Sequence, residues 1–427
     1  MQRIIINTLF LALSVNSFAQ ESWKKGNGTE KKPYILETAE QLFALAQAVN
    51  NGNSFENTYF ELANDIDLQC SQSKLWTPIG SKEPTPFKGF FNGKNYTLSG
   101  LLVNDSALYN AGLFGFVFMG KVENVRIVKS SFSANCYVGS VVGYLMGGEV
   151  YNCYNEATVA GKDNVGGIVG QAYTAKINAC VNHGNVVGKL HVGGIVGAGY
   201  GNVQILNSYN RSYISGFQYV GGIAGKVEGS AKKAIVKSCY QEDVFCKIGV
   251  IGASSLAVVE NCYYADVAGI GNFTEGTKIA YSEMKTDDFL SRLNQAGGLW
   301  KKDPKISVNS GYPILKTAVY KGIITNEATD VTFDDATLNG SVLSDVKEKI
   351  IRKGFELWEE GGGDTTRFFV LTNPLYYTIT DLKSAQIYHY RTIVVTSTQT
   401  LYGDVQAFRT LLQPHKHGEG CGHPHHH

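Results

Sequence analysis

The chain has 427 residues, with 38 basic and 37 acidic side chains and a formal net charge of +1. This balance gives no electrostatic reason to expect nucleic acid or an anionic membrane surface as a partner. Glycine (48), tyrosine (24) and phenylalanine (21) are abundant and methionine (4) is rare, which favours strands and tight turns over helices. The length allows two or three domains.

Residues 1–19 have the features of a secretory signal peptide. Arg3 precedes a short apolar run, and the small residues Ser17 and Ala19 stand at positions −3 and −1 of a cleavage site after Ala19. The alternative is a transmembrane anchor, but the run is too short and Asn7 interrupts it. No later segment is apolar and long enough to span a bilayer. We therefore expect a secreted or cell-surface protein without a transmembrane segment.

Residues 20–60 are expected to form an N-terminal cap with one helix. Thr38 followed by Gln41 predicts a capping box at the start of the run AEQLFALAQAVN. Apolar residues of this run share one helical face, which we expect to close the end of the following domain. These residues are Leu42, Leu45, Ala46 and Val49.

A glycine motif recurs along the next segment, as VGGIVG at 165–170 and at 192–197 and as VGGIAG at 220–225. The last glycines of this and related motifs are Gly115, Gly143, Gly170, Gly197, Gly225 and Gly252. Their spacing is nearly constant at about 27 residues, and a fixed period in this range predicts a solenoid. The segments between the glycines are short and β-rich, without a helical apolar stripe.

About 27 residues suits one coil of a three-sided parallel β-helix, which we predict for residues 61–272. A β-propeller is the alternative, but its blades need about 40 residues or more. Equivalent residues of successive coils stack about 4.8 Å apart, so Asn155, Asn182 and Asn210 should form an asparagine ladder. The repeat glycines mark sharp bends, or places where two backbones approach too closely for a Cβ.

The glycine core at this spacing resembles the GLUG repeat family. The resemblance extends upstream through PYILETAEQLFALAQAVNNG and AGLFG, and downstream through SGYPIL, so that it covers residues 23–316. That family occurs in large bacterial surface proteins and in the non-catalytic N-terminal region of IgA-specific metalloproteases. The resemblance implies a β-solenoid and a bacterial surface location, and it implies no activity. No HExxH motif is present, so protease activity does not carry over.

The remaining chain divides into a C-terminal cap at 273–322, a sandwich at 323–411 and a tail at 412–427. A second helix is predicted at 283–295, and Trp300 is expected to pack near it. Strands in alternating pattern in the sandwich segment predict a β-sandwich that resembles a fibronectin type III domain. In that resemblance Leu382 and Tyr388 have the spacing of a tyrosine corner, and Trp358 is a candidate core tryptophan. The expected fold class is therefore all-β with short helical caps.

Eight cysteines in an exported chain suggest pairing. The stacking places Cys153 beside Cys180, and Cys239 beside Cys262, within disulfide reach. The alternative is a stack of small buried thiols, which we favour because stacked parallel side chains seldom have the torsion of a disulfide.

The last residues, PHKHGEGCGHPHHH, are rich in metal-binding side chains. His415, His417, Cys421, His423, His425, His426 and His427 can bind Zn²⁺, Ni²⁺ or Cu²⁺, although no regular element fixes their geometry. A native tail and an expression tag both remain open. No other cofactor is expected.

No constellation of catalytic residues accompanies the repeats. Polysaccharide-active β-helices need two or more convergent carboxylates, and Glu123, Glu149 and Glu260 are separated within their columns. We therefore expect no enzyme but an exported bacterial binding or adhesion scaffold, whose partner is a host glycoprotein, a glycan or another cell-surface component. A polysaccharide-active enzyme and a metal-scavenging protein acting through the tail are the alternatives. Candidate ligand-stacking side chains are Tyr154, Tyr173, Tyr200, Tyr209, Tyr213 and Tyr219.

Overall fold

The fold was obtained as a computed structural model and consists of two compact units. The first comprises Met1–Lys301 with Leu315–Ala318, and the second comprises Lys302–Ile314 with Val319–His427. The structure describes residues 23, 25–82, 84–241, 248–266, 275–295, 297–303, 309, 311–317, 323–342, 349–360, 365–371, 375–397, 400–403 and 405–413. The signal-peptide prediction (1–19) and the seven metal-binding candidates of the tail lie outside the described residues.

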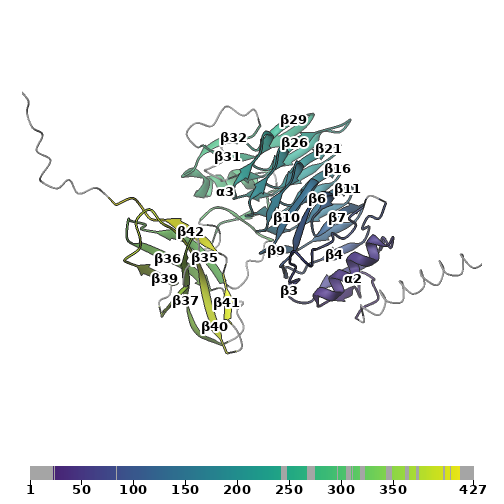
Figure 1. The fold of residues 1–427 in the computed structure, drawn as a ribbon. Helices are drawn as coiled ribbons and strands as arrows, with labels where there is room; N and C mark the ends of the chain where they lie inside the picture. Colours follow the sequence, from purple (N-terminus) through teal and green to yellow (C-terminus); the bar gives the residue numbers. More distant parts are fainter. Residues whose placement is uncertain are drawn as a thin grey trace, which may run out of the picture. The chain divides into compact units, whose positions relative to one another are not determined.

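The first unit is a parallel β-solenoid of about eight turns, whose strands stack from the purple end to the green end in Figure 1. Four ladders run along it. Sheet 1 contains β1 (Tyr34–Leu36), β2 (Tyr59–Leu62), β4 (Phe90–Asn92), β8 (Lys121–Glu123), β12 (Glu149–Tyr151), β17 (Lys176–Asn178), β22 (Gln204–Leu206), β27 (Ala234–Lys237) and β30 (Ala257–Glu260). Sheet 2 contains β3 (Ile66–Asp67), β5 (Thr97–Ser99), β9 (Arg126–Val128), β13 (Tyr154–Asn155), β18 (Val181–Asn182), β23 (Tyr209–Asn210), β28 (Tyr240–Gln241), β31 (Tyr263–Asp266) and β32 (Thr277–Ala280).

Sheets 3 and 4 complete each coil. Sheet 3 contains β6 (Leu102–Ala111), β10 (Ser131–Gly139), β14 (Thr158–Ala160), β15 (Asp163–Gly166), β19 (Val186–Val187), β20 (Leu190–Gly193), β24 (Ile214–Ser215) and β25 (Gln218–Gly221). Sheet 4 contains β7 (Phe114–Phe118), β11 (Val142–Met146), β16 (Val169–Tyr173), β21 (Val196–Tyr200), β26 (Ala224–Glu228) and β29 (Ile251–Ser255). The predicted solenoid is confirmed, but a coil contributes to four ladders and not to the three strands expected.

The register follows the sequence period. Val169 pairs with Val196, and Gln171 with Ala198, so Gly170 lies one layer from Gly197. Inward side chains of sheet 1 form an apolar column along the axis, because alternate residues of a strand point to opposite faces. Its members Val122, Val150, Ile177, Ile205 and Val236 are fully buried. Stacking of such columns builds one continuous core through the solenoid.

The repeat glycines lie where sheet 4 meets the backbone of sheet 3. A Cβ on Gly197 would stand 2.5 Å from the carbonyl carbon of Asn164 and 2.5 Å from the nitrogen of Val165. Gly170 and Gly225 face the equivalent backbone atoms one coil earlier and one coil later, at 2.4 Å. Of the two explanations considered, close backbone approach is therefore the one that holds at these positions.

Helix α2 (Ala39–Asn50) lies within the first coil, between β1 and β2. The predicted capping box is present: Thr38 accepts from the Gln41 backbone, and the Gln41 side chain accepts from the Thr38 backbone. The predicted apolar face, with Leu42, Leu45, Ala46 and Val49, is buried in the solenoid core. Since β1 already pairs with β2, sheet 1 begins at Tyr34, inside the segment 20–60 that we expected to precede the ladder.

The C-terminal part of this unit contains η1 (Glu283–Lys285), α3 (Asp287–Asn294), β33 (Trp300–Lys301) and part of a further short strand, β34 (Ile314–Leu315). Thr286 caps α3 by accepting from the Phe289 amide at 3.2 Å. Phe289 packs edge-on against Tyr240 and Tyr263, with ring centroids 5.9 and 5.2 Å away. Helix α3 therefore covers the outward face of sheet 2 in the last coils.

The second unit is a two-sheet antiparallel sandwich. One sheet contains β35 (Ile323–Thr329), β36 (Ala336–Val342) and β39 (Leu375–Ile379); the other contains β37 (Ile350–Glu359), β38 (Thr366–Val370), β40 (Ile387–Thr396), β41 (Thr400–Tyr402) and β42 (Gln406–Arg409). The predicted tyrosine corner is present, because the Lys383 amide donates to the Tyr388 hydroxyl at 2.9 Å. The expectation for Trp358 was wrong. Phe355 and Leu357 point into the core, while Trp358 is partly exposed and stacks on His389.

Candidate functional site

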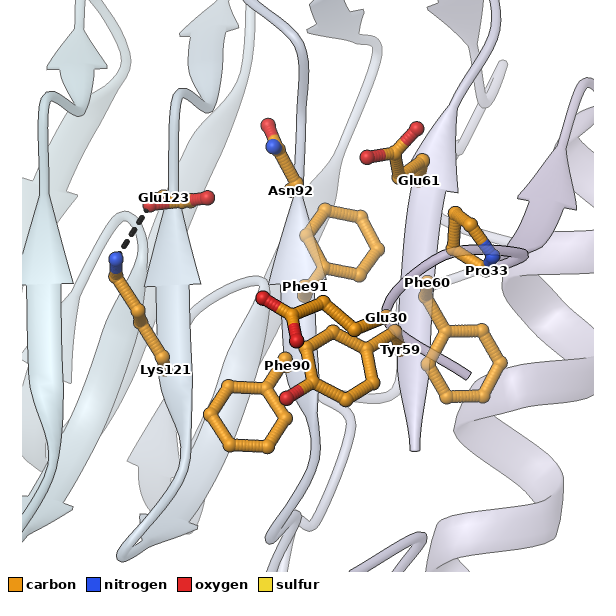
Figure 2. A pocket seen from close by; sticks show the side chains of 10 residues that line it. All are labelled: Glu30, Pro33, Tyr59, Phe60, Glu61, Phe90, Phe91, Asn92, Lys121 and Glu123. Carbon is orange, nitrogen blue, oxygen red and sulfur yellow. Dashed lines mark ion pairs between the residues drawn. The ribbon is translucent and has the colours of Figure 1, made fainter. Parts of the chain in front are cut away.

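The outward face of sheet 1 carries a pocket near the N-terminal end of the solenoid (Figure 2). Three neighbouring strands, β2, β4 and β8, each present two outward residues to it. The cavity volume is about 340 Å³, at the lower end of the range of about 300–1,000 Å³ for small-molecule sites. Its lining comprises Glu30, Pro33, Tyr59, Phe60, Glu61, Phe90, Phe91, Asn92, Lys121 and Glu123, and we call it the sheet 1 pocket.

Two aromatic rings form a platform in this pocket. Tyr59 and Phe90 occupy paired positions on β2 and β4, and their rings stack with centroids 4.4 Å apart and planes 13° apart. The stacking follows from the register, since paired residues of adjacent parallel strands project side by side. Phe60 and Phe91, the next residues along, point inward and are 1% exposed. The chain therefore holds a stacked aromatic pair at the surface, next to buried neighbours on the same strands.

A polar row runs beside the platform, two residues further along each strand. Its members Glu61, Asn92 and Glu123 are paired in register across β2, β4 and β8. Glu30 approaches the rings from the loop before β1 (Figure 2). Carboxylate and amide oxygens accept hydrogen bonds, and the amide nitrogen donates them. The pocket therefore combines a ring-stacking surface with a line of hydrogen-bonding groups.

Lysines neutralise much of the acidic charge here. Lys94 lies 3.6 Å from Glu61, and Lys121 lies 2.6 Å from Glu123. Lys121 also lies 3.7 Å from Glu149, which pairs in turn with Lys176 at 3.0 Å. Burial is the largest single effect and opposes the charged form of Lys121. The hydrogen bond and charge of Glu123, with the charges of Glu149 and Tyr151, together outweigh it and raise the pKa of Lys121. Both carboxylates of the polar row are therefore held by a lysine, and beside the row Lys121, Glu149 and Lys176 alternate in charge along the axis.

Sequence reasoning did not find this pocket. The interval from Tyr59 to Phe90 equals the interval from Phe90 to Lys121, but both are longer than the glycine period, so these residues lie outside the glycine-based register. The signal in the sequence is the similar local pattern of YFEL and FFN, in which two aromatic residues precede a polar one, so that the first and third residues share a face. Two further acids of this region, Asp65 and Asp67, do not line the pocket and accept from the backbone amides of Thr97 and Gln69.

The asparagine column lies inside the solenoid and does not reach a surface site. Asn155 donates to Asn182, and Asn182 to Asn210, both at 2.7 Å, and all three side chains are fully buried. They fill the space beside Gly167 and Gly194, where a Cβ would clash with them. A second column that we did not predict runs along a corner with left-handed backbone, where Asn152 donates to Asn124 at 2.7 Å and to Asn95 at 3.1 Å.

The four stacked cysteines are free, buried thiols in the structure. Cys153 and Cys180 each point to a carbonyl two residues back, at 3.4 and 3.5 Å, and Cys239 and Cys262 do so at 3.3 Å. Burial first, and then the neighbouring thiol, raises the pKa of Cys153 and of Cys239 well above the ordinary value. Thiols with raised pKa react slowly, so these pairs serve as core.

The candidate tyrosines divide between buried and exposed positions. Tyr154 (8% exposed) and Tyr209 (0%) are buried, and Trp300 lies 5.9 Å from the Tyr209 ring. Tyr173, Tyr213 and Tyr219 are exposed, whereas Tyr200 is half-buried. Two of the six are therefore unavailable for stacking on a ligand. Within the described ranges, no group of three metal-ligating side chains is found, and no helix is both long and apolar enough to cross a membrane.

A family model described as the GLUG motif matches residues 134–160, which run from β10 to β14. The chain contains the GLUG motif. It is 30% identical over 148 residues to halomucin of Haloquadratum walsbyi, covering 33% of this chain and 2% of halomucin. It is also 30% identical over 125 residues to a putative Gly-rich membrane protein of Evansella cellulosilytica, covering 28% of this chain and 14% of that protein. The chain thus spans a small part of these curated relatives.

Solved structures similar to part of the GLUG-motif chain include small β domains. The fibronectin type III domain of human fibronectin type III domain containing protein 3 is 20% identical, with a TM-score of 0.19, over 25% of this chain and 99% of that one. The sensor domain of the anti-sigma factor RsgI4 in Pseudobacteroides cellulosolvens is 20% identical, with a TM-score of 0.18, over 21% of this chain and 94% of that one.

Proposed function

We propose that this GLUG-motif protein is a cell-surface or secreted binding protein whose sheet 1 pocket holds a saccharide, either free or as the glycan of a glycoprotein. The stacked pair of Tyr59 and Phe90 beside a polar row is the observation that carries the proposal. The similarity to halomucin and to a putative membrane protein, together with the predicted signal peptide, supports the surface location.

The chemistry of the pocket matches the two kinds of surface that a sugar ring presents. The C–H face of a sugar is apolar and packs on an aromatic face, whose quadrupole is negative. The hydroxyl groups at the ring edge donate to carboxylate and amide oxygens, and accept from amide or ammonium groups. In the sheet 1 pocket the rings of Tyr59 and Phe90 offer the first surface. Glu61, Asn92 and Lys121 offer the second.

The test is binding of the full-length chain to an array of mammalian and bacterial glycans, followed by calorimetry with the best hit. Tyr59→Ala and Phe90→Ala should each weaken binding at least tenfold, because each removes half of the platform. Tyr213→Ala is the matched control, since Tyr213 is 48% exposed on the solenoid and does not line the pocket. Equal affinity of all four proteins, or no binding to any glycan, would contradict the proposal.

A polysaccharide-active enzyme remains the second candidate, because Glu30, Glu61 and Glu123 line one cavity. Glycoside hydrolysis uses a pair of carboxyl groups on either side of the scissile bond. Two of the three carboxylates are already engaged by lysines, which fits binding better than turnover. Incubation of the bound glycan with the protein should release no new reducing ends. Release that Glu61→Gln or Glu123→Gln abolishes would favour the enzyme.

A further inference from the structure

A second, larger cavity lies on another side of the solenoid, where sheets 3 and 4 meet in the early coils. Its volume is about 620 Å³. Tyr109 and Tyr137, on β6 and β10, and Tyr144, on β11, line one part of it, and Asn110, Gln171 and Asp105 line another. No residue of the sheet 1 pocket takes part, so the two cavities are separate. We call the second one the tyrosine cavity.

The three tyrosines form a continuous aromatic wall. The ring centroids of Tyr109 and Tyr137 are 6.3 Å apart, and those of Tyr137 and Tyr144 are 5.9 Å apart. Phe116 stacks behind Tyr144 at 5.0 Å with planes 10° apart, and is itself 4% exposed. Tyr109 is 52% exposed, and exposed aromatic side chains that gather in one patch mark interaction surfaces. Buried Phe116 therefore supports the wall from the core side, and Tyr109 is accessible to a ligand from solvent.

Asn110 supplies an independent observation. Its residue is 7% exposed, yet its side-chain oxygen Oδ1 has no hydrogen-bond partner among the described residues. Buried polar atoms in folded proteins are almost always paired, and an unpaired acceptor calls for an explanation. The same ladder position two coils later is Asn164, whose amide donates to Gln171 at 2.6 Å and whose Oδ1 lies 2.8 Å from His191 Nδ1. The Oδ1 atom of Asn164 thus has a partner, whereas the Oδ1 atom of Asn110, which lines the cavity, has none among the described residues.

Backbone pairing limits where a peptide ligand could add a strand beside the aromatic wall. Strand β10 is already bonded to β6 and to β15, and β11 is bonded to β7 and to β16. Neither β10 nor β11 therefore has a free edge for strand addition. Strand β6, which carries Tyr109 and Asn110, pairs with β10 alone among the described strands, so the choice of ligand rests on the side chains of the cavity. Aromatic faces beside an unpaired acceptor suit a ligand with an apolar ring face and hydroxyl donors at its edge.

We propose that the tyrosine cavity is a second saccharide site, which takes a neutral oligosaccharide of two or three rings with one hydroxyl donating to Asn110 Oδ1. The inference shares its ligand class with the proposed function but uses none of the same residues, so either site can fail without the other. A protein with both sites would hold a glycan chain, or two chains, at two points on different faces, and such divalent attachment raises avidity without new contacts.

The experiment is calorimetry and saturation-transfer NMR of the full-length chain with maltotriose, cellotriose, xylotriose and chitotriose. Tyr137→Asn should weaken binding at the second site at least tenfold, and asparagine occupies this ladder position in the neighbouring coils, so the fold should tolerate it. Tyr144→Gln is the second variant, because the next coil carries Gln171 at that position. Asn110→Gly should also weaken binding, while Asn110→Asp, which keeps the acceptor oxygen, should retain it.

Tyr59→Ala separates the two sites. If the inference holds, Tyr59→Ala leaves the second binding event intact, and Tyr137→Asn leaves the first intact. Loss of all trisaccharide binding in Tyr59→Ala would overturn the second site while supporting the first. Unchanged affinity and stoichiometry in both Tyr137→Asn and Tyr144→Gln would overturn it as well, and so would binding of unglycosylated peptides to the wall in place of the trisaccharides.

Discussion

The repeat glycines have one physical role, which is to let the backbone of sheet 4 touch that of sheet 3. At Gly197 a methyl group would lie within 2.5 Å of three backbone atoms, none of which belongs to a flexible side chain. Glycine lacks a side chain to pack and is otherwise unfavourable in a strand. Its recurrence once in every coil therefore records a contact that every coil must make.

Gly197→Ala should destabilise the solenoid by about 3 kcal/mol or more, because the backbone would have to separate locally. Gly199→Ala is the control on the same strand. Its new methyl would meet only the side chain of Val203, at 3.0 Å, and should change stability by less than about 1 kcal/mol. Denaturant unfolding followed by circular dichroism measures both. Equal stability of the two variants would show that the close approach is not what selects glycine.

His183 makes the solenoid sensitive to acid. Burial first, and then the charges of Arg211 and Arg126, lowers the pKa of His183 to about 3 from an ordinary 6.5. Below pH 6.5 the unfolded chain takes up a proton here that the folded chain does not, so stability falls as pH drops toward 3. Between pH 6.5 and pH 4 the loss should be roughly 3 kcal/mol.

Thermal unfolding across this pH range measures the effect. In His183→Gln the fall of the melting temperature with decreasing pH should be shallower than in the unmodified protein. His389→Gln, in the other unit, is the control and should leave the solenoid transition unchanged. If His183→Gln keeps the full pH dependence, the buried imidazole is not its source.

Single residues also show where prediction from sequence ends. The asparagine column was predictable, because Asn155, Asn182 and Asn210 repeat in phase with the glycines. The burial of Tyr154 and Tyr209 was not predictable, because their strands have only two residues and show no alternation of apolar and polar side chains. Tyr209 is buried by Trp300, which lies several coils further along the sequence. When a residue outside the repeats buries a side chain, the repeat sequence alone does not predict that burial.

At the scale of elements, the helices and strands follow their local signals. The capping box of α2 was readable from Thr38 and Gln41, and the helix at 283–295 begins later than expected because Thr286 caps it. The sheet 1 pocket was not readable, because β2, β4 and β8 join the ladder at a wider sequence spacing, before the regular period begins. In the sandwich, the alternation of β37 was recognised but its inward face was assigned to Trp358 in place of Phe355 and Leu357.

At the corner of the sandwich, the Lys383 amide donates a hydrogen bond to the Tyr388 hydroxyl. Tyr388→Phe leaves the amide without this partner and should destabilise the sandwich by about 1–3 kcal/mol. Tyr402→Phe is the control, because Tyr402 is 37% exposed and its ring keeps its contact with Arg391. Amide hydrogen exchange, read peptide by peptide, measures the stability of the sandwich separately from that of the solenoid. Equal protection of strand β40 in both variants would contradict the role of the corner.

At the scale of the whole molecule, the solenoid turns one sequence period into rows of identical positions on several faces. The sheet 1 pocket and the tyrosine cavity arise in the early coils, where the outward residues depart from the later repeats. From the edge of the sheet 1 pocket, Lys121, Glu149 and Lys176 continue along sheet 1 as a chain of ion pairs. The regular coils thus provide the support, and the irregular ones provide the candidate binding surfaces.

Both proposed sites require that equivalent residues of successive coils lie side by side. Zero-length carbodiimide crosslinking of the full-length chain, read by mass spectrometry, tests this directly. Glu149 should crosslink to Lys121 and to Lys176, each one coil away, with Lys121–Glu123 as the local positive control and Glu149→Gln as the negative one. Crosslinks from Glu149 to Lys237, three coils away, in place of Lys121 and Lys176 would contradict the stacked solenoid.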